Sequence, residues 1–196
     1  MLQHRLREPV AVIINPLCKG LIRMGVKANA LTVVGALGVS FSALYFYGRG
    51  SFVLGTIFVT LFALLDLLDG TVARLSGSHS SKWGALLDST LDRISDAMIL
   101  TGILIFFVSI ADPNIYLCIS VMVTSGLVSY IRARAEGLKI ECSVGIAERT
   151  ERLIVILAGA ALFGFGINIA LVASLWLALV LTLITVAQRL VVVFRA

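Results

Sequence analysis

Charged residues are scarce in this chain of 196 residues: only 14% are Asp, Glu, Lys or Arg, whereas 59% are hydrophobic. The mean hydropathy is +1.04. So little charge excludes an ordinary soluble domain, whose surface needs far more of it, and the composition is typical of a membrane protein.

Cysteine is also rare. Cys18, Cys118 and Cys142 are odd in number and lack the spacing of metal ligands, which argues against a disulfide framework or a zinc site. The chain shows no internal repeat of solenoid length. Its first 27 residues contain no apolar run long enough for a cleaved signal peptide.

The formal net charge is +5. A basic chain sometimes binds nucleic acid, but here the basic residues lie at the ends of apolar runs. That arrangement favours an anionic lipid surface and anionic substrates. We therefore expect membrane lipids, and no nucleic acid, among the partners of the protein.

The first 27 residues mix basic side chains with apolar ones that recur every three or four positions. This period predicts an amphipathic helix lying in the membrane interface, interrupted or kinked at Pro9 and Pro16. The alternative is a partly disordered basic tail.

Six apolar stretches follow, each near the twenty or so residues that a bilayer requires. They cover about 30–47, 51–74, 84–109 and 115–131, with two more within 153–188 that separate near 164–168. The sequence thus predicts an all-α integral membrane protein that forms one domain over 1–196, with an interfacial helix at 1–27 and a bundle of six transmembrane helices at 28–196.

The basic residues predict the orientation of this bundle. With six spans, every Lys and Arg except Arg49 falls on one side of the membrane or in the adjoining helix ends, and Asp112 is the one acidic residue on the opposite side. The positive-inside rule makes the basic side cytoplasmic. We expect both termini and all candidate site residues at the cytoplasmic face of the plasma membrane.

Acidic residues concentrate at the ends of the second and third predicted spans, in the pattern D-x2-D-G-x2-A-R, nine residues, then G-x3-D-x3-D. Asp66 and Asp69 share one helix face, and Asp88 and Asp92 share another. If the two helices are antiparallel neighbours, the four carboxylates meet and need cations between them.

Carboxylate oxygens are hard ligands, which suit Mg2+ or Mn2+. The small residues Gly70, Ala73 and Gly84 leave room beside the backbone for a ligand. On helical geometry alone, such carboxylates also fit a cation or proton transporter.

The pattern resembles the signature of the CDP-alcohol phosphotransferases, membrane enzymes of phospholipid synthesis. All eight signature positions match: Asp66, Asp69, Gly70, Ala73, Arg74, Gly84, Asp88 and Asp92. The resemblance implies that an acceptor hydroxyl attacks the β-phosphorus of CDP-diacylglycerol and that CMP leaves. It also implies a homodimer, for which the small residues Gly35, Gly38, Ala160 and Gly164 allow close helix contacts, although such residues pack helices within a protomer as well.

The resemblance assigns roles to these residues. Two Mg2+ ions, with Mn2+ as the alternative, would be held by Asp66, Asp69, Asp88 and Asp92, and Asp92 would also act as the general base. The CDP-lipid would contact Asn29, Thr32, Asp66, Asp69, Gly70, Ala73, Arg74 and Gly84.

Arginines at the cytoplasmic helix ends suit a phosphate on the acceptor, and Arg149 and Arg152 are neighbours if they lie on a helix. The segment 129–153 resembles the actinobacterial phosphatidylinositol phosphate synthases; its sequence is SYIRARAEG…VGIAERTERL. The resemblance implies that the phosphate of inositol 1-phosphate is held by Arg132, Arg152 and Arg189. The synthases more often have lysine at the position of Arg132. The alternative is that these arginines anchor the protein at the lipid surface. In that case Glu148 and Glu151 neutralise Arg149 and Arg152.

The text Asp92-Arg93-Ile94-Ser95-Asp96 also favours an inositol phosphate acceptor, since phosphatidylglycerophosphate synthases usually have lysine after the position of Asp92. Asp96 lies one turn past Asp92, and either contacts an acceptor hydroxyl or supports the metal cluster. Glycerol 3-phosphate remains the alternative acceptor.

Overall fold

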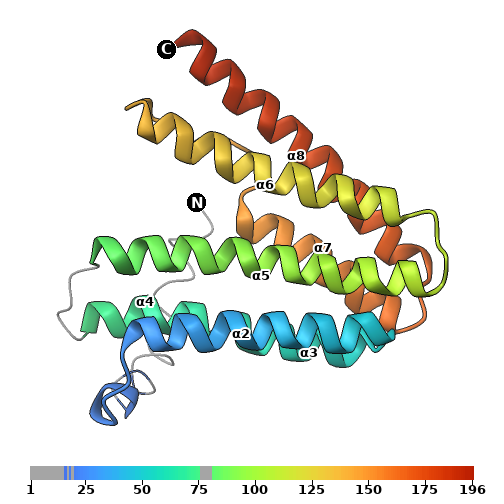
Figure 1. Ribbon diagram of the computed structural model, residues 1–196, viewed down its shortest axis with the longest axis horizontal. Coiled ribbons are helices and arrows are strands. Elements are labelled where there is room, and N and C mark those ends of the chain that lie inside the picture. The colour runs from blue at the N-terminus through green and yellow to red at the C-terminus, as the bar shows by residue number, and fades with distance from the viewer. Residues whose placement is uncertain (1–15, 17, 19, 76–80) are drawn as a thin grey trace. The chain divides into compact units, whose positions relative to one another are not determined.

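The computed structural model describes residues 16, 18, 20–75 and 81–196, and only the backbone of 66, 67, 73 and 74. The described residues form helices and their connections, with no strand among them, so the predicted all-α class is confirmed. The elements are α2 (Ala28–Phe46), η1 (Tyr47–Arg49), α3 (Phe52–Ala63), α4 (Leu65–Leu75), α5 (Lys82–Ser109), α6 (Ile115–Gly137), α7 (Arg149–Gly164) and α8 (Ile169–Arg195). Figure 1 labels the α-helices.

Several of these helices have the length and apolarity of membrane spans. Within the described residues, four stretches qualify: Ala28–Arg49, Phe52–Val72, Ile115–Gly137 and Ile169–Arg195. The predicted third span, α5, is 28 residues long but carries Asp88, Asp92, Arg93 and Asp96 between its N-terminus and its middle. The predicted fifth span, α7, has only 16 residues. The protein is therefore a membrane protein with at least these four apolar helices.

The second predicted span, 51–74, is interrupted. One residue, Leu64, separates α3 from α4, although no glycine or proline lies between Thr56 and Asp69. The interruption lies beside a close approach of α2, because a Cβ on Gly35 would be 3.2 Å from the carbonyl oxygen of Phe62. As a result Asp66 and Asp69 lie on a short separate helix.

The contacts divide the chain into two compact units. The first comprises the described residues up to 41 together with 58–95, and the second comprises 42–57 together with 96–196. Because α5 begins in one unit and ends in the other, it contributes Asp88 and Asp92 to the first and Asp96 to the second.

The core of the first unit forms around Cys18, Leu31, Leu68 and Val72, with Leu21, Ile22, Val26, Ala28 and Leu65 packed against them. The described residues between 16 and 23 are helical, and Gly25, with φ of 76°, ends that helix. Its amide and that of Val26 donate back to Ile22 and Leu21, which is the Schellman arrangement that glycine favours. The rest of the predicted interfacial helix lies outside the described residues.

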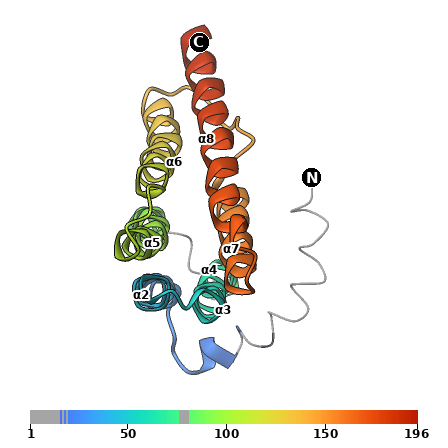
Figure 2. The same cartoon turned by 90° about the vertical axis from the view of Figure 1, so that its right-hand side faces the viewer.

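In the second unit, α8 packs against both α6 and α7 (Figure 2). The rings of Tyr47, Phe106 and Phe163 surround Phe52, with centroids 4.8–5.1 Å away. This cluster joins the α2–α3 connection to α5 and α7.

Small residues are used for packing inside the chain. A Cβ on Gly38 would overlap the ring of Phe62, and one on Gly164 would lie 2.7 Å from Val53. Ala160 is fully buried. These contacts favour the alternative in which the small residues pack helices within one protomer.

Candidate active site and the arginine group

The first turns of α2 contact α4 of the first unit through Thr32 and Asp69. The Thr32 hydroxyl lies 2.5 Å from Oδ2 of Asp69 and 3.1 Å from the carbonyl oxygen of Ala28. A hydroxyl has one proton, so the shorter contact to the carboxylate is the stronger one. Both side chains are buried, and a buried carboxylate requires such a partner. Thr32 therefore fixes one oxygen of Asp69.

The start of α5 lies against the same part of α2. Ser81 caps α5, because its Oγ accepts a hydrogen bond of 2.9 Å from the amide of Gly84. A Cβ on Gly84 would lie 3.2 Å from Oδ1 of Asn29. Asn29 and Thr32 are one turn apart, so α2 contacts both halves of the acidic pattern.

The acidic residues of α5 are partly buried. Asp88 and Asp92 follow Gly84 at intervals of four on this helix, as the spacing predicted. Oδ2 of Asp92 is 3.9 Å from Nη1 of Arg93, and the Asp92 side chain is 17% exposed. A carboxylate that is neither deeply buried nor fully solvated suits a base that must reach a substrate.

The metal site itself stays a prediction. Among the residues whose side chains are described, no three His, Cys, Asp or Glu side chains form a group that could hold a metal ion, and the side chain of Asp66 lies outside the description. The donors that are present fit a divalent ion, since Asp69, Asp88 and Asp92 belong to one unit and offer hard oxygen ligands.

Space beside Gly70 agrees with a ligand at this place. A Cβ on Gly70 would meet no atom of the described residues within 4 Å. At Gly84, by contrast, the same addition would press on Asn29 and Ser81. Among the described residues, no side chain fills the space beside Gly70 on α4 immediately after Asp69. The side chains of Ala73 and Arg74 lie outside the description.

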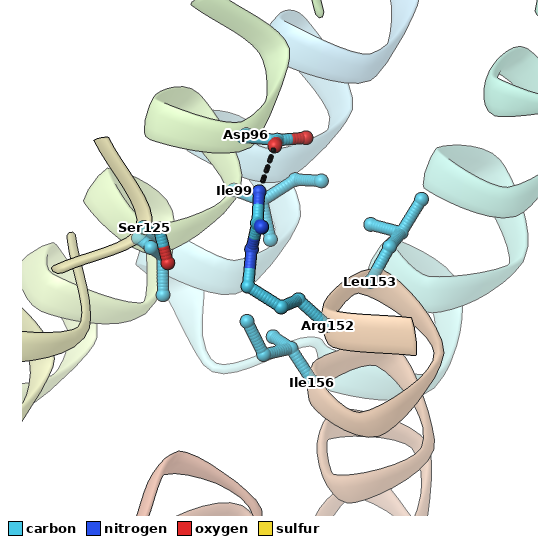
Figure 3. A pocket seen from close by; sticks show the side chains of 7 residues that line it. Asp96, Ile99, Ser125, Arg152, Leu153 and Ile156 are labelled. Atoms are coloured by element: carbon cyan, nitrogen blue, oxygen red, sulfur yellow. Dashed lines mark hydrogen bonds and ion pairs between the residues drawn. The ribbon is translucent and has the colours of Figure 1, made fainter. Parts of the chain in front are cut away.

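In the second unit, one carboxylate joins two of the predicted phosphate-binding arginines. Figure 3 shows its contact with one of them, Arg152. Oδ1 of Asp96 lies 3.3 Å from Nε of Arg149, and Oδ2 lies 3.3 Å from Nη2 of Arg152. The side chain of Arg152 is only 4% exposed, so its charge depends on this partner. The predicted neighbourhood of Arg149 and Arg152 is confirmed, because both lie on α7.

A small cavity lies between Asp96 and Arg152 on one side and Ser125 on the other, with apolar walls from Ile99, Leu100, Leu153 and Ile156. The Ser125 hydroxyl is buried and has no hydrogen-bond partner in the described part of the chain. Its usual acceptor in a helix, the carbonyl oxygen of Val121, lies 3.2 Å from the hydroxyl of Thr124.

The other two predicted arginines have different surroundings. Arg132 pairs with Glu136 at 3.0 Å on the exposed end of α6. Arg189 on α8 is 2% exposed, and its Nε and Nη1 donate to the carbonyl oxygens of Val144 and Val128 at 2.8 and 2.5 Å. The structure thus gathers Arg149 and Arg152 around Asp96 and gives Arg189 to the backbone.

Sequence reasoning missed two residues of this region. Thr185 and Ala147 are fully buried, and the amide of Ala147 donates to the Thr185 hydroxyl at 3.0 Å. Neither residue is charged. Ala147 lies within the stretch 129–153, but it acts through its backbone amide, and Thr185 lies in no motif, so the sequence contains no signal for their contact.

Comparison with known proteins gives a consistent result. Residues 26–186 match the family described as CDP-alcohol phosphatidyltransferase. The phosphatidylinositol phosphate synthase of Streptomyces avermitilis is 39% identical over 204 aligned residues, which cover 100% of this chain and 83% of that protein. The crystal structure of Mycobacterium tuberculosis phosphatidylinositol phosphate synthase with CDP-DAG bound has a TM-score of 0.88 and 36% identity, and 94% of each chain is covered. The same protein in complex with manganese and citrate gives a TM-score of 0.86 and 35% identity, with 92% of this chain and 88% of that chain covered.

The family match includes both halves of the acidic pattern and the arginines of α6 and α7. A solved relative binds CDP-DAG, and the same relative binds manganese, a divalent ion. The chain therefore belongs to the CDP-alcohol phosphatidyltransferase family and is a membrane transferase.

Proposed function

We propose that this protein is a phosphatidylinositol phosphate synthase, which transfers the phosphatidyl group of CDP-diacylglycerol to inositol 1-phosphate and releases CMP. The observation that favours a phosphorylated acceptor is the convergence of Arg149 and Arg152 on Asp96. Two guanidiniums on one helix face form a site for a phosphate that a free polyol would leave unused. The similar synthases of actinobacteria support the same acceptor.

The carboxylates of α4 and α5 would hold the metal. We assign Asp66, Asp69, Asp88 and Asp92 as ligands of two Mg2+ ions, which Mn2+ can replace. When bound, divalent ions neutralise the charge of the diphosphate. Thr32 keeps one oxygen of Asp69 in a fixed direction. The CDP moiety would contact Asn29, Gly70, Ala73, Arg74 and Gly84 in addition to these carboxylates.

Asp92 is the proposed general base. It takes the proton from the acceptor hydroxyl as that oxygen attacks the β-phosphorus, and CMP leaves with the electron pair of the broken P–O bond. Asp96 follows Asp92 by one turn on α5. One helix therefore carries both the proposed base and the carboxylate that holds two arginines of the acceptor site.

The acceptor phosphate would bind Arg132, Arg149, Arg152 and Arg189. Arg149 and Arg152 have the strongest support, because a single carboxylate already holds their guanidiniums near each other. Arg189 donates to two carbonyl oxygens, so it would contribute through a remaining N–H group. Asp96 would exchange part of its pairing with the arginines for a hydroxyl of the acceptor.

For the membrane arrangement, we propose that the whole chain forms one domain of six transmembrane helices in the plasma membrane. The apolar second half of α5 and the short α7 complete the six, and the N-terminal segment lies in the interface. Both termini and the active site would be cytoplasmic, where the basic helix ends lie. We also propose a homodimer, which sizing in native lipid tests: a monomer there would contradict it.

The acceptor is tested with purified protein in lipid, labelled CDP-diacylglycerol and a panel of phosphorylated and free polyols, scored for CMP. Product with inositol 1-phosphate, and none with free inositol, is the expected result. Product only with glycerol 3-phosphate would make the protein a phosphatidylglycerophosphate synthase. CMP release with any acceptor would also exclude a role as an ion transporter alone.

A further inference from the structure

A chain of hydrogen bonds joins α8 to Arg152 of α7 through the segment between α6 and α7. We propose that Thr185 is a positioning residue for the acceptor phosphate, acting through Ala147 on Arg152. The inference rests on the proposed function, because it gives these arginines the acceptor phosphate as their ligand.

The first link is the contact between Thr185 and Ala147. The amide of Ala147 donates to the Thr185 hydroxyl at 3.0 Å, and that hydroxyl donates in turn to the carbonyl oxygen of Leu181 at 2.9 Å. Both Thr185 and Ala147 have no exposed surface. The hydroxyl is thus the partner of an amide that water cannot reach.

The second link runs from Ala147 to Asp96. The carbonyl oxygen of Ala147 accepts a hydrogen bond of 3.1 Å from Nη1 of Arg152. The other end of the same guanidinium, Nη2, lies 3.3 Å from Asp96. Ala147 therefore connects α8 on its amide side with Arg152 on its carbonyl side. The planar guanidinium is held at both ends, which fixes the direction of its remaining N–H groups.

A second anchor holds the same segment on α8. Arg189, one turn after Thr185, donates from Nε to the carbonyl oxygen of Val144 at 2.8 Å. Gly145 has φ of 143°, a conformation that side chains rarely adopt. A Cβ on Gly145 would also press on the methyl group of Thr185. Residues 144–147 are therefore packed closely against α8, and a shift of Ala147 requires a change at Thr185 or Arg189.

The consequence concerns acceptor affinity. Recognition of a phosphate by arginine depends on the direction of the guanidinium as well as its charge. Without the Thr185 hydroxyl, the buried amide of Ala147 loses its partner and the segment must move to satisfy it. The carbonyl that orients Arg152 then moves too, whereas the carboxylates assigned to the CDP-lipid belong to the other unit.

The test compares four variants of the full chain in lipid. Thr185→Val removes the hydroxyl at nearly constant volume, and Thr185→Ser restores it. Thr182→Val is the matched control, because Thr182 is equally buried one turn earlier on α8 but bonds to Thr124 of α6. For each, the KM for inositol 1-phosphate, the KM for CDP-diacylglycerol and kcat are measured by CMP release. Thr185→Ala serves as a second variant without the hydroxyl.

Thr185→Val is expected to raise the KM for inositol 1-phosphate about tenfold, because a misdirected Arg152 guanidinium loses about one charge-assisted hydrogen bond to the acceptor phosphate. Its kcat and its KM for CDP-diacylglycerol should stay within about twofold of the wild-type values. Thr185→Ser and Thr182→Val should behave as wild type in all three parameters. Inorganic phosphate should compete with inositol 1-phosphate for the same arginines. Its inhibition constant should therefore change in the same ratio as the acceptor KM.

An unchanged acceptor KM in both Thr185→Val and Thr185→Ala would overturn the inference. An equal rise of the acceptor KM in Thr182→Val would also overturn it. So would loss of folding in Thr185→Val and Thr185→Ala alone, because the contact would then serve only the fold. Failure of the proposed function is a different result: the wild-type protein itself would release no CMP in response to inositol 1-phosphate.

Discussion

The Thr32 hydroxyl on α2 donates to the carboxylate of Asp69 on α4 at 2.5 Å, across 37 positions of the chain. The sequence analysis placed Thr32 among contacts of the CDP-lipid. The structure gives it a second role, since it orients a residue that the family resemblance makes a metal ligand. Groups that orient metal ligands affect metal affinity strongly.

Replacing Thr32 by Val should therefore weaken metal binding about tenfold or more, because Asp69 loses the donor that fixes Oδ2. The Mg2+ concentration for half-maximal CMP release, and the rise in melting temperature with added Mn2+, measure the effect. Thr32→Ser keeps the hydroxyl and should resemble wild type. Identical metal dependence in the Val variant would show that Asp69 needs no such support.

Asp92→Asn should lower kcat by about a hundredfold or more, the usual contribution of a general base. The amide has nearly the same size and cannot accept the proton. Binding of CDP-diacylglycerol should persist, as judged by the thermal shift that the lipid causes. The exposed Ser89 on the same helix supplies the control Ser89→Ala. If CMP appears at the normal rate with Asp92→Asn, another group is the base.

Asp96→Asn should raise the KM for inositol 1-phosphate and lower the free energy of unfolding by about 2 kcal/mol. The reason is that Arg152, which is 4% exposed, keeps its charge while the opposing carboxylate at 3.3 Å is lost. The melting temperature and acceptor KM are measured against Glu151→Gln, which removes an exposed charge from the same α7 helix. If the two variants have the same melting temperature and the same acceptor KM, the ion pairs of Asp96 contribute to neither stability nor acceptor binding.

Gly70→Ala should leave the fold as stable as before or stabilise it by up to about 1 kcal/mol, because alanine favours helices and a Cβ there meets no described atom within 4 Å. The KM for CDP-diacylglycerol should nevertheless rise several-fold. Gly84→Ala provides the comparison, since its Cβ would lie 3.2 Å from Asn29 and Ser81, whose side chains must shift to accept it. An unchanged KM in Gly70→Ala would place the nucleotide elsewhere.

Apolar length and the positions of charges predicted most of the helices. The expected turn at 164–168 lies between α7 and α8 as found. The end of the fourth span was placed too early, because α6 continues through Arg132 and Arg134 to Gly137. The interruption at Leu64 had no signal in the sequence, since packing against α2 rather than a glycine or proline accompanies it.

The candidate site was predictable where it depends on helical spacing. Arg149 and Arg152 share a helix, and Asp88 and Asp92 follow Gly84 on α5 as expected. The pairing of the two arginines with Asp96 was not predicted, because it joins residues 53 and 56 positions apart and depends on how α5 packs on α7.

The most direct test of the central claim is the position of the metal. Crystals of the protein with Mn2+ and CDP-diacylglycerol would be examined by anomalous scattering at the manganese edge. The account predicts two peaks between α4 and α5, each coordinated by oxygens of Asp66, Asp69, Asp88 or Asp92. Aspartates that face apart, or manganese bound away from them at saturating concentration, would contradict it.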